Sequence, residues 1–259
     1  MLAELLELAP AGVEETEAGD GVIEYALYGA PGELPALPRL EAAAGQSLVE
    51  VTTEEVEDGW DTRWREFHQP VVIGDTLMVR PPWVAPSHST HDLVIDPGQA
   101  FGTGTHPTTR LCLELLLDVP EHIGSFVDLG CGSGVLAVLA AKLGYAPVLA
   151  LDNDPAAIQS ARENVRLNDA DIVEIRRNDL RMDPLVTART VAANLLAPLL
   201  RTFAGRLSDA PELPDRLIVS GLLEDERQKI GEAFAVHGLM ELDQRTMGGW
   251  TALLLEPAP

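Results

Sequence analysis

The fold is decided by one stretch, Val-Asp-Leu-Gly-Cys-Gly-Ser-Gly at residues 127–134. Its apolar beginning is typical of a buried strand, and the continuous apolar run at residues 135–141 is typical of a helix packed against a sheet. The glycines between them permit positive φ angles and let a ligand approach the backbone closely. Free backbone amides at the start of a helix favour an anionic group. The stretch therefore predicts a strand, a ligand-binding turn and a helix in succession.

Outward from this unit, short apolar runs alternate with helical patterns as far as the carboxyl end. Such alternation predicts parallel strands joined by crossover helices. We expect strands at residues 125–129, 147–151, 172–175, 190–193, 216–220, 239–244 and 250–256, and helices at residues 133–143, 154–167, 195–207 and 222–236. A short turn around residues 247–249 favours an antiparallel final pair. The expected fold class is α/β, with a Rossmann-like sheet of seven mostly parallel strands behind a small α+β domain.

The amino-terminal part has a different pattern. Residues 1–54 hold a helix-like start at Leu2–Leu8 and strand-like runs at 13–17, 22–28 and 47–52, which predicts the small α+β domain. Residues 55–91 follow as a connection, in which an amphipathic helix precedes a proline-rich bend; the apolar stripe of this helix is Val56, Trp60, Trp64 and Phe67. The larger domain is expected at residues 92–259.

The charge balance excludes some classes of function. The chain has 18 basic and 41 acidic side chains, a net charge of −23, which disfavours direct DNA binding because phosphate readers need a basic face. Residues 1–60 hold 14 of the acidic side chains and one basic side chain, Arg39. This acidic part is either a solvated surface or a docking module for a basic partner.

Targeting and metal signals are weak. No apolar run approaches the ~20 residues of a membrane span, and the amino terminus has glutamates in its apolar stretch and no basic leader. Two cysteines without a CxxC pair favour a reducing compartment, so we expect a cytoplasmic protein. The histidines have no metal-ligand spacing, and we expect no bound metal.

A second pattern agrees with a nucleotide-like ligand. Asp152 follows the next strand, 22 residues after Gly130, where a carboxylate can accept hydrogen bonds from both ribose hydroxyls. Dehydrogenases use the same device, but the dinucleotide fingerprint needs glycine at position 135, where this chain has Val135. Asp152 could instead cap the next helix, although Asp154 and Pro155 suit that role better.

Two further segments carry candidate site residues. Residues 96–110 read DPGQAFGTGTHPTTR, with three glycines and four threonines. A purely structural loop rarely has this composition, because such residues cost ordering entropy without filling a core, and we expect the loop to cover the ligand. Asn194 stands at the end of the fourth strand, on the edge where open α/β sheets bind ligands.

These segments together resemble a known family. The pattern D-x-G-x-G-x-G at residues 128–134 resembles motif I of the class I S-adenosylmethionine-dependent methyltransferases. Over roughly residues 55–259, the chain resembles the PrmA family, the methyltransferases of ribosomal protein L11. The segments that carry this resemblance are the tryptophan helix at 60–67, Pro82-Trp83, DPGQAFGTGTHPTTRLCL at 96–113, DLGCGSGVLA at 128–137, LDNDPAAI at 151–158 and Asn194-Leu195.

The resemblance implies the cofactor and the residues that bind it. The cofactor would be S-adenosylmethionine. Its contacts would fall on the following residues: Thr109, Asp128, Gly130, Gly132, Asp152 and Asn194. Residues 92–259 would be the cofactor-binding catalytic domain and residues 1–54 the substrate-recognition domain. The family's amino-terminal domain starts with a strand, whereas this chain starts with the helix-like Leu2–Leu8, so either that first strand is lost or the start of the chain is assigned too late.

The resemblance also implies the reaction, which is methyl transfer to lysine side chains, and to the terminal amine, of ribosomal protein L11. Asn194 would be the catalytic residue, orienting a neutral amine, while Phe101, Leu195 and Trp250 would bind the substrate. We expect no obligatory general base, and His106 is interpreted as a residue that orders its loop. The chain lacks the Asn-Pro-Pro-Tyr sequence of amide-methylating relatives after the fourth strand, which disfavours glutamine as the acceptor. The enzyme is expected to be a monomer without membrane contact.

Other functions stay open on the sequence. The chain could methylate lysine on another protein, or a small molecule. It could also be a ribosome assembly factor that binds S-adenosylmethionine without catalysis. A nicotinamide dehydrogenase is disfavoured by Val135.

Overall fold

The computed structural model describes residues 13–19, 22–27, 69–98 and 101–258, and the chain divides into two compact units, Met1–Trp60 and Asp61–Pro259. In the first unit, β1 (Val13–Gly19) and β2 (Val22–Leu27) pair antiparallel. Two strands expected from the sequence are therefore confirmed. The helix expected at Leu2–Leu8, the strand at 47–52 and the helix at 55–68 lie outside the described residues.

A seven-stranded sheet forms the centre of the second unit, in the order β11-β12-β10-β9-β6-β7-β8. Its strands are β6 (Phe126–Leu129), β7 (Val148–Asp152), β8 (Val173–Arg177), β9 (Thr190–Asn194), β10 (Arg216–Leu223), β11 (Leu239–Met247) and β12 (Trp250–Pro257). The strands β6 to β10 are parallel, whereas β12 pairs antiparallel with both β10 and β11. The expected mostly parallel sheet and its antiparallel final pair are confirmed.

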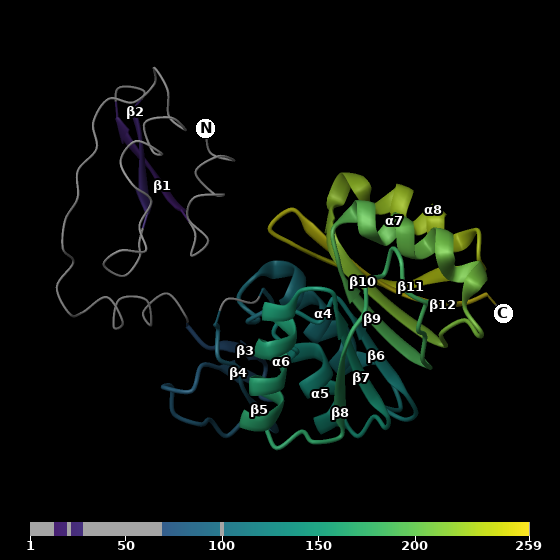
Figure 1. Cartoon of the computed structure of the whole chain (residues 1–259), viewed down its shortest axis with the longest axis horizontal. Helices are drawn as coiled ribbons and strands as arrows, with labels where there is room; N and C mark the ends of the chain where they lie inside the picture. Colours follow the sequence, from purple (N-terminus) through teal and green to yellow (C-terminus); the bar gives the residue numbers. More distant parts are fainter. Residues whose placement is uncertain (1–12, 20–21, 28–68, 99–100, 259) are drawn as a thin grey trace. The chain divides into compact units, whose positions relative to one another are not determined.

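Helices cover both faces of this sheet (Figure 1). They are α4 (Pro107–Asp118), α5 (Val135–Leu143), α6 (Pro155–Leu167), α7 (Ala197–Arg206) and α8 (Arg227–Ala235). Alternate residues of each strand enter two separate cores: Phe126 packs with the side chains of α4, α5 and α6, and Val127 with those of α7 and α8. Within the described residues, none of the helices has the length and apolar character needed to cross a membrane.

Local signals in the sequence explain two of the helix ends. Asp154 accepts a hydrogen bond from the Ala156 amide at 2.9 Å and caps α6, with Pro155 in its first turn, as expected. Gly144 ends α5 with a φ of 101°, in the left-handed region that glycine tolerates.

Three helices begin two or more residues later than expected, and the first of them, α5, begins at Val135 rather than at residue 133. Leu195 donates its backbone N–H to the Ser220 carbonyl oxygen at 3.0 Å, and Leu196 is extended, so α7 begins at Ala197 rather than at residue 195. The strand β10 continues to Leu223, so α8 begins at Arg227 rather than at residue 222. The delayed start of α7 leaves Leu195 in the loop directly after β9.

The second unit also contains a small sheet that the sequence analysis does not foresee. The strands β3 (Val71–Ile73), β4 (Leu77–Arg80) and β5 (His91–Val94) form it, with β4 antiparallel to β3 and parallel to β5. Leu77, Val79 and Leu93 are buried in the same core as α4, α5 and α6. Residues 71–91 are thus packed into the second unit, which differs from the connection expected at 55–91.

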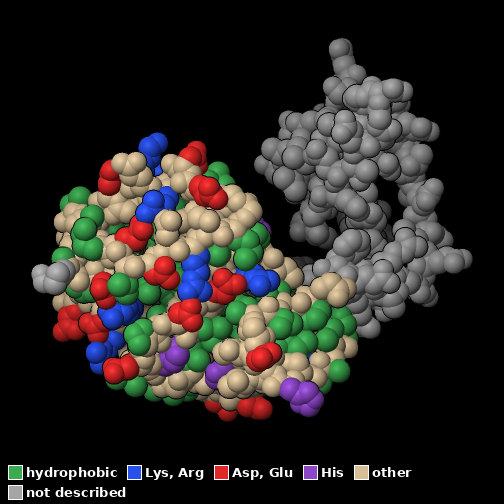
Figure 2. Space-filling view, turned by 180° about the vertical axis from the view of Figure 1, so that it is seen from behind, with side chains coloured by type: hydrophobic (Ala, Val, Ile, Leu, Met, Phe, Trp, Pro, Cys, Tyr) green, Lys and Arg blue, Asp and Glu red, His purple; other side chains and the backbone are tan. Residues whose placement is uncertain are grey.

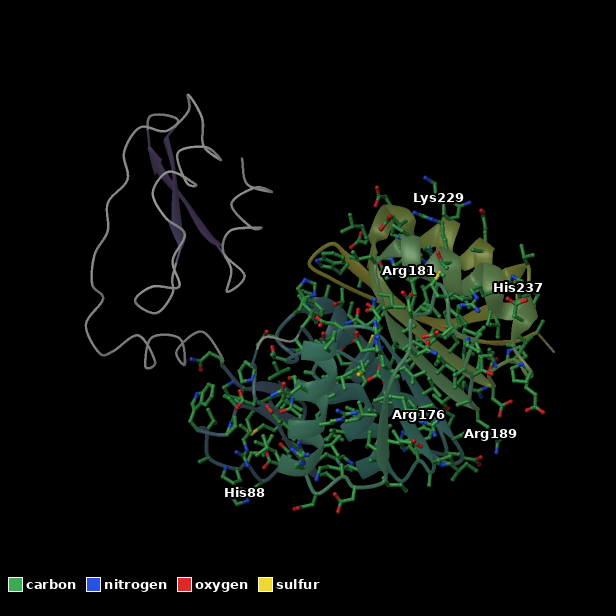
Figure 3. The ribbon with its side chains drawn as sticks, viewed as in Figure 1. His88, Arg176, Arg181, Arg189, Lys229 and His237 are labelled. Carbon is green, nitrogen blue, oxygen red and sulfur yellow. The ribbon has the colours of Figure 1, made fainter. Side chains whose placement is uncertain are left out.

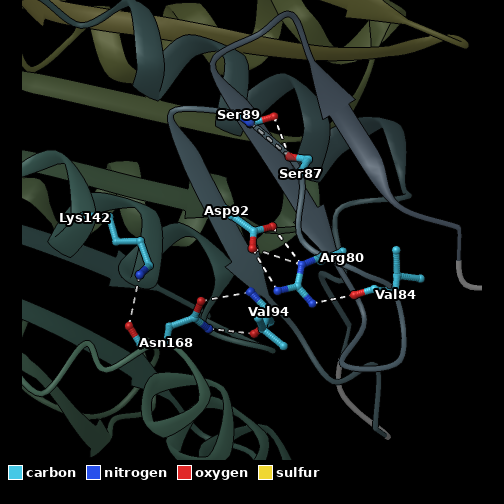
Figure 4. A network of polar contacts seen from close by, with 8 residues as sticks. All are labelled: Arg80, Val84, Ser87, Ser89, Asp92, Val94, Lys142 and Asn168. Carbon is cyan, nitrogen blue, oxygen red and sulfur yellow. Dashed lines mark hydrogen bonds and ion pairs between the residues drawn. The ribbon is translucent and has the colours of Figure 1, made fainter.

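A buried ion pair joins two strands of this small sheet (Figure 4). Arg80 donates from Nε and Nη2 to the Asp92 carboxylate at 2.8 Å, and from Nη1 to the Val84 carbonyl oxygen at 2.6 Å. Arg80 is only 8% exposed, so its charge needs this compensation. The pair fixes the proline-rich bend after β4 to the start of β5.

Candidate functional site

A cavity of about 380 Å³ opens at the carboxyl ends of β6, β7 and β9. The chain order reverses between β6 and β9, and open α/β sheets bind ligands at such a switch point. Eight of the nine predicted site residues line the cavity: Phe101, Thr109, Asp128, Gly130, Gly132, Asp152, Asn194 and Leu195. The ninth, Trp250, does not line it.

The glycine turn between β6 and α5 forms the floor of the cavity. Gly132 has a φ of +52°, and a Cβ there would collide with the carbonyl oxygen of Phe101. Gly130 has a φ of +74°, and its backbone N–H donates to the Leu151 carbonyl oxygen at 2.8 Å. Position 132 requires glycine for two reasons. Its positive φ strains any other residue, and a Cβ there would push away Phe101, which lies in the loop before α4 (the covering loop, residues 96–106). The glycines therefore keep side chains out of the space beside the turn, whereas the backbone N–H groups of residues 130–133 are already paired with Leu151, Asp152 and Phe101.

Asp152 ends β7, and hydrogen bonds hold its carboxylate in place. Its Oδ2 accepts from the Gly132 N–H at 2.9 Å, and its Oδ1 accepts from the Asp154 N–H at 3.0 Å. Asp154 caps α6, so Asp152 is not needed as the helix cap. A carboxylate oxygen accepts more than one hydrogen bond, so this side chain still has acceptor capacity toward the cavity.

Asp128 is the most unusual group of the site. The side chain is 1% exposed, and its Oδ2 has no hydrogen-bond partner among the described residues. Burial raises the pKa of the Asp128 carboxyl to about 7; a backbone hydrogen bond from Ala137 opposes this rise, and the nearby charge of Asp152 adds to it. A cationic group in the cavity would supply the partner that Oδ2 lacks.

Asn194 and Thr109 join two elements at the cavity wall. Asn194 ends β9, and Thr109 lies in the first turn of α4. Asn194 donates from Nδ2 to Thr109 Oγ1 at 3.3 Å. This bond leaves Asn194 Oδ1 as an acceptor that can orient the N–H of a ligand.

Two rings of the loop before α4 and one ring of β12 form a row. Phe101, which is 59% exposed, and Trp250 both make edge contacts with the His106 ring, each with a centroid separation of 5.1 Å. A second groove, of about 420 Å³, lies along this loop. It is lined by Phe101, Gly102, Thr103, Thr105, His106 and Pro107, so Phe101 and Gly102 border both spaces. Trp250 lines neither space, and its ring contacts the site through the His106 ring.

His106 caps α4. Its Nδ1 accepts from the Thr108 N–H at 3.3 Å and lies 2.8 Å from Thr108 Oγ1. Burial lowers the pKa of the His106 imidazole. Because Nδ1 accepts a backbone N–H, the neutral ring carries its proton on Nε2 and has no free acceptor nitrogen. The geometry therefore fits a residue that orders the loop and not a general base.

Sequence reasoning missed several residues of the site. Asn153, Asp154 and Ala157 line the cavity together with Asp152, and their position in sequence beside Asp152 could have indicated this. Two other residues, Ser133 and Asn164, bind the covering loop without lining the cavity. No pattern in the sequence marks Asn164.

The described residues contain no cluster of three or more His, Cys, Asp or Glu side chains arranged to hold a metal ion. Lys and Arg side chains lie among Asp and Glu side chains on the face of the second unit drawn in Figure 2. Arg176, Arg181 and Arg189, labelled in Figure 3, pair with Glu174, Asp179 and Asp215 respectively. These arginines therefore carry compensated charges and form no basic face.

Comparisons with known proteins agree with this geometry. The family model described as "Ribosomal protein L11 methyltransferase (PrmA)" matches residues 23–257. A ribosomal protein L11 methyltransferase of Heliobacterium modesticaldum is 36% identical over 242 residues, which cover 92% of this chain and 76% of that protein. One of Listeria innocua is 34% identical over 253 residues, covering 91% and 79%.

A solved structure is also similar. It is the crystal structure of the ribosomal protein L11 methylase from Lactobacillus delbrueckii subsp. bulgaricus, which superposes with a TM-score of 0.67 at 26% identity. The match covers 74% of this chain and all of that one.

Proposed function

Because the chain belongs to the ribosomal protein L11 methyltransferase (PrmA) family, we propose that it methylates amines of ribosomal protein L11, namely lysine side chains and the terminal amine. S-adenosylmethionine is the cofactor of this family. The observation that carries the proposal is one cavity, at the switch point of the sheet, that unites Thr109, Gly130, Asp152 and Asn194.

The cavity fits S-adenosylmethionine in its charge pattern. The cofactor is a sulfonium with an ammonium and a carboxylate, and the methyl group on its sulfur is electrophilic. The glycine turn carries no side chains that would keep the cofactor at a distance, and Asp152 suits the ribose hydroxyls. The unpartnered Oδ2 of buried Asp128 suits a cationic part of the cofactor. Gly132 would keep the turn close to the ligand.

Residues of this chain would prepare the acceptor amine. A lysine with a pKa near ~10.4 is protonated at neutral pH and must lose its proton before it can attack. Desolvation beside the cationic cofactor would lower that pKa. Asn194 Oδ1 would then accept an N–H of the neutral amine and align it, which is a matter of orientation and not of proton removal.

The aromatic row would form the wall of the acceptor site. Phe101 borders both the cofactor cavity and the neighbouring groove. It would therefore line the passage through which the lysine side chain reaches the cofactor. Phe101 and His106 line this groove, and the face of an aromatic ring attracts a cationic or methylated amine. Leu195, which follows β9, would exclude water from the reacting atoms.

The acidic amino-terminal part would recognise the basic substrate. Residues 1–60 form one compact unit and carry 14 acidic side chains against one basic side chain. Charge complementarity accelerates encounter with a basic protein and weakens with salt. We propose that the enzyme acts as a monomer in the cytoplasm, where reducing conditions preserve the free, buried thiols of Cys112 and Cys131.

Mass spectrometry of purified ribosomal protein L11, after incubation with this protein and S-adenosylmethionine, tests the proposal. We expect mass increases in steps of one methyl group, and peptide mapping that assigns them to lysine or the terminal amine. An Asp152→Ala variant is the matched control and should produce no increase. Stable binding of L11 and cofactor with an unchanged mass would instead identify a non-catalytic assembly factor.

A further inference from the structure

Helix α6 and the residue after it present two buried asparagines, one turn apart, to the backbone at the end of β5 and just after it. Asn168 accepts from the Val94 N–H at 2.9 Å and donates to the Val94 carbonyl oxygen at 2.6 Å (Figure 4). Asn164 accepts from the Asp96 N–H at 2.8 Å. Asn168 is 5% exposed and Asn164 is fully buried. They therefore pair the backbone at the entrance of the covering loop, much as a neighbouring strand would.

Asn164 makes a bond that Asn168 does not. Its Nδ2 donates to the carbonyl oxygen of Ser133, in the glycine turn, at 2.9 Å. Ser133 is fully buried and holds the loop from the other side: its N–H donates to the Phe101 carbonyl oxygen at 2.9 Å, and its Oγ donates to the Gly102 carbonyl oxygen at 2.6 Å. A continuous path of hydrogen bonds thus runs from Asn164 through Ser133 to Phe101 and Gly102.

This path connects the two halves of the proposed site. The glycine turn is the floor of the cofactor cavity, and Phe101 and Gly102 border both that cavity and the acceptor groove. The same asparagine binds Asp96, where the covering loop begins. The Asn164 side chain therefore links the start of the loop, at Asp96, to the glycine turn, at Ser133.

We propose that Asn164 is a positioning residue for methyl transfer, which fixes the Phe101–Gly102 wall of the acceptor groove to the cofactor turn through Ser133. The predicted effect on kcat rests on the proposed function, whereas the predicted effect on the order of the loop does not. Asn164 lies outside the cavity lining, and it acts through Ser133 and not by touching either substrate.

A comparison of Asn164→Ala with Asn168→Ala tests the proposal. Both changes remove a buried amide that binds backbone groups of the same segment, so both should lower stability. Only Asn164→Ala should lower kcat with L11, by about 10- to 100-fold, because misplacement of a site wall has effects of that order. Asn168→Ala also removes the bond from Asn168 Nδ2 to the Asn164 carbonyl oxygen at 2.7 Å. It leaves the Asn164 side chain and its bond to Ser133 in place, so kcat should stay within about two-fold. Equal losses of kcat in the two variants would overturn the proposal.

Hydrogen–deuterium exchange gives a readout that needs no methyl acceptor. With Asn164→Ala, peptides covering residues 101–106 and the Ser133 amide should take up deuterium faster than in the parent and in Asn168→Ala. Unchanged exchange there would contradict the path through Ser133. If the parent binds the cofactor but does not methylate L11, the proposed function fails while this exchange result still decides the positioning role.

Asn164→Asp offers a conservative rescue if the alanine variant does not fold. The protonated carboxyl can accept from the Asp96 N–H and donate its O–H to the Ser133 carbonyl oxygen, as the amide does. The ionised form cannot donate and would face that oxygen with a negative charge. The ratio of variant to parent kcat should therefore fall as the pH rises, and a ratio independent of pH would refute the role of the Ser133 bond. The carboxylate of Asp96, which accepts from the Gly98 N–H, adjoins the backbone group that this side chain binds. Its negative charge disfavours ionisation of the new carboxyl and moves the fall of the ratio to higher pH.

Discussion

Replacing Asp128 with asparagine should change how stability depends on pH. The folded protein raises the pKa of this carboxyl from 3.8 to about 7. A group with a raised folded pKa contributes stability that is fully present below its unfolded pKa and is lost as the pH rises through the folded pKa. Because a pKa difference of one is worth ~1.4 kcal/mol, the difference between folded and unfolded Asp128 corresponds to roughly 4 kcal/mol. The Asp128 contribution to the free energy of unfolding of the cofactor-free parent should therefore fall by about this amount between roughly pH 4 and pH 8.

The assay is urea unfolding of the parent and Asp128→Asn at about pH 5 and about pH 8, without cofactor. The amide cannot ionise, so the variant should gain about 2–3 kcal/mol relative to the parent between these two pH values. Asp171→Asn, at an exposed position, controls for the loss of one charge. A stability difference between parent and Asp128→Asn that is the same at both pH values would refute the reasoning. The variant should also bind S-adenosylmethionine more weakly at the higher pH, because the cation loses its buried counter-charge.

Three further predictions concern the cofactor and the substrate. Asp152→Ala should abolish measurable cofactor binding in calorimetry, since each ribose hydroxyl loses a charge-assisted acceptor worth ~1.5–3 kcal/mol; binding equal to that of the parent would mean that the ribose lies elsewhere. S-adenosylhomocysteine should bind saturably and NADH should not, because Val135 occupies the third glycine position of the dinucleotide turn; a saturable fluorescence titration with NADH would contradict the cofactor assignment. Deleting residues 1–60 should leave cofactor binding intact but reduce kcat/KM for intact L11, and the parent's affinity for L11 should fall with salt as the Debye length drops from ~10 to ~3 Å. A truncated protein with the parent's kcat/KM would show that the acidic unit is only a solvated surface.

The large sheet could be predicted almost strand by strand. Its central strands are buried on both faces, so their sequences are continuous apolar runs, and Asp154 with Pro155 marks a helix start by local chemistry. The candidate cofactor residues could be predicted for a related reason. They follow strands or glycines whose positions in the sequence are distinctive, and the carboxyl ends of parallel strands meet at one edge of the sheet.

The small sheet could not be predicted in this way. β3 and β4 have three and four residues, too few to show an alternating pattern, and β5 is anchored by Asn168, which is distant in the sequence. Trp250 shows the same limit. Its sequence position placed it near the acceptor, but His106 lies between it and Phe101.

Residues close together in the chain determine the order of strands and helices, the glycine turn and the candidate carboxylates Asp128 and Asp152. These features can therefore be predicted from the sequence without the tertiary structure. The packed molecule sets how strongly each polar group is desolvated and which distant groups it meets. Asp128 is buried because β6 lies between β9 and β7 inside the sheet, and its Oδ2 has no hydrogen-bond partner among the described residues. Asn164 binds Asp96 and Ser133 across 68 and 31 residues of sequence. Burial and long-range hydrogen bonds arise only when distant segments pack together, and no local pattern in the chain encodes them.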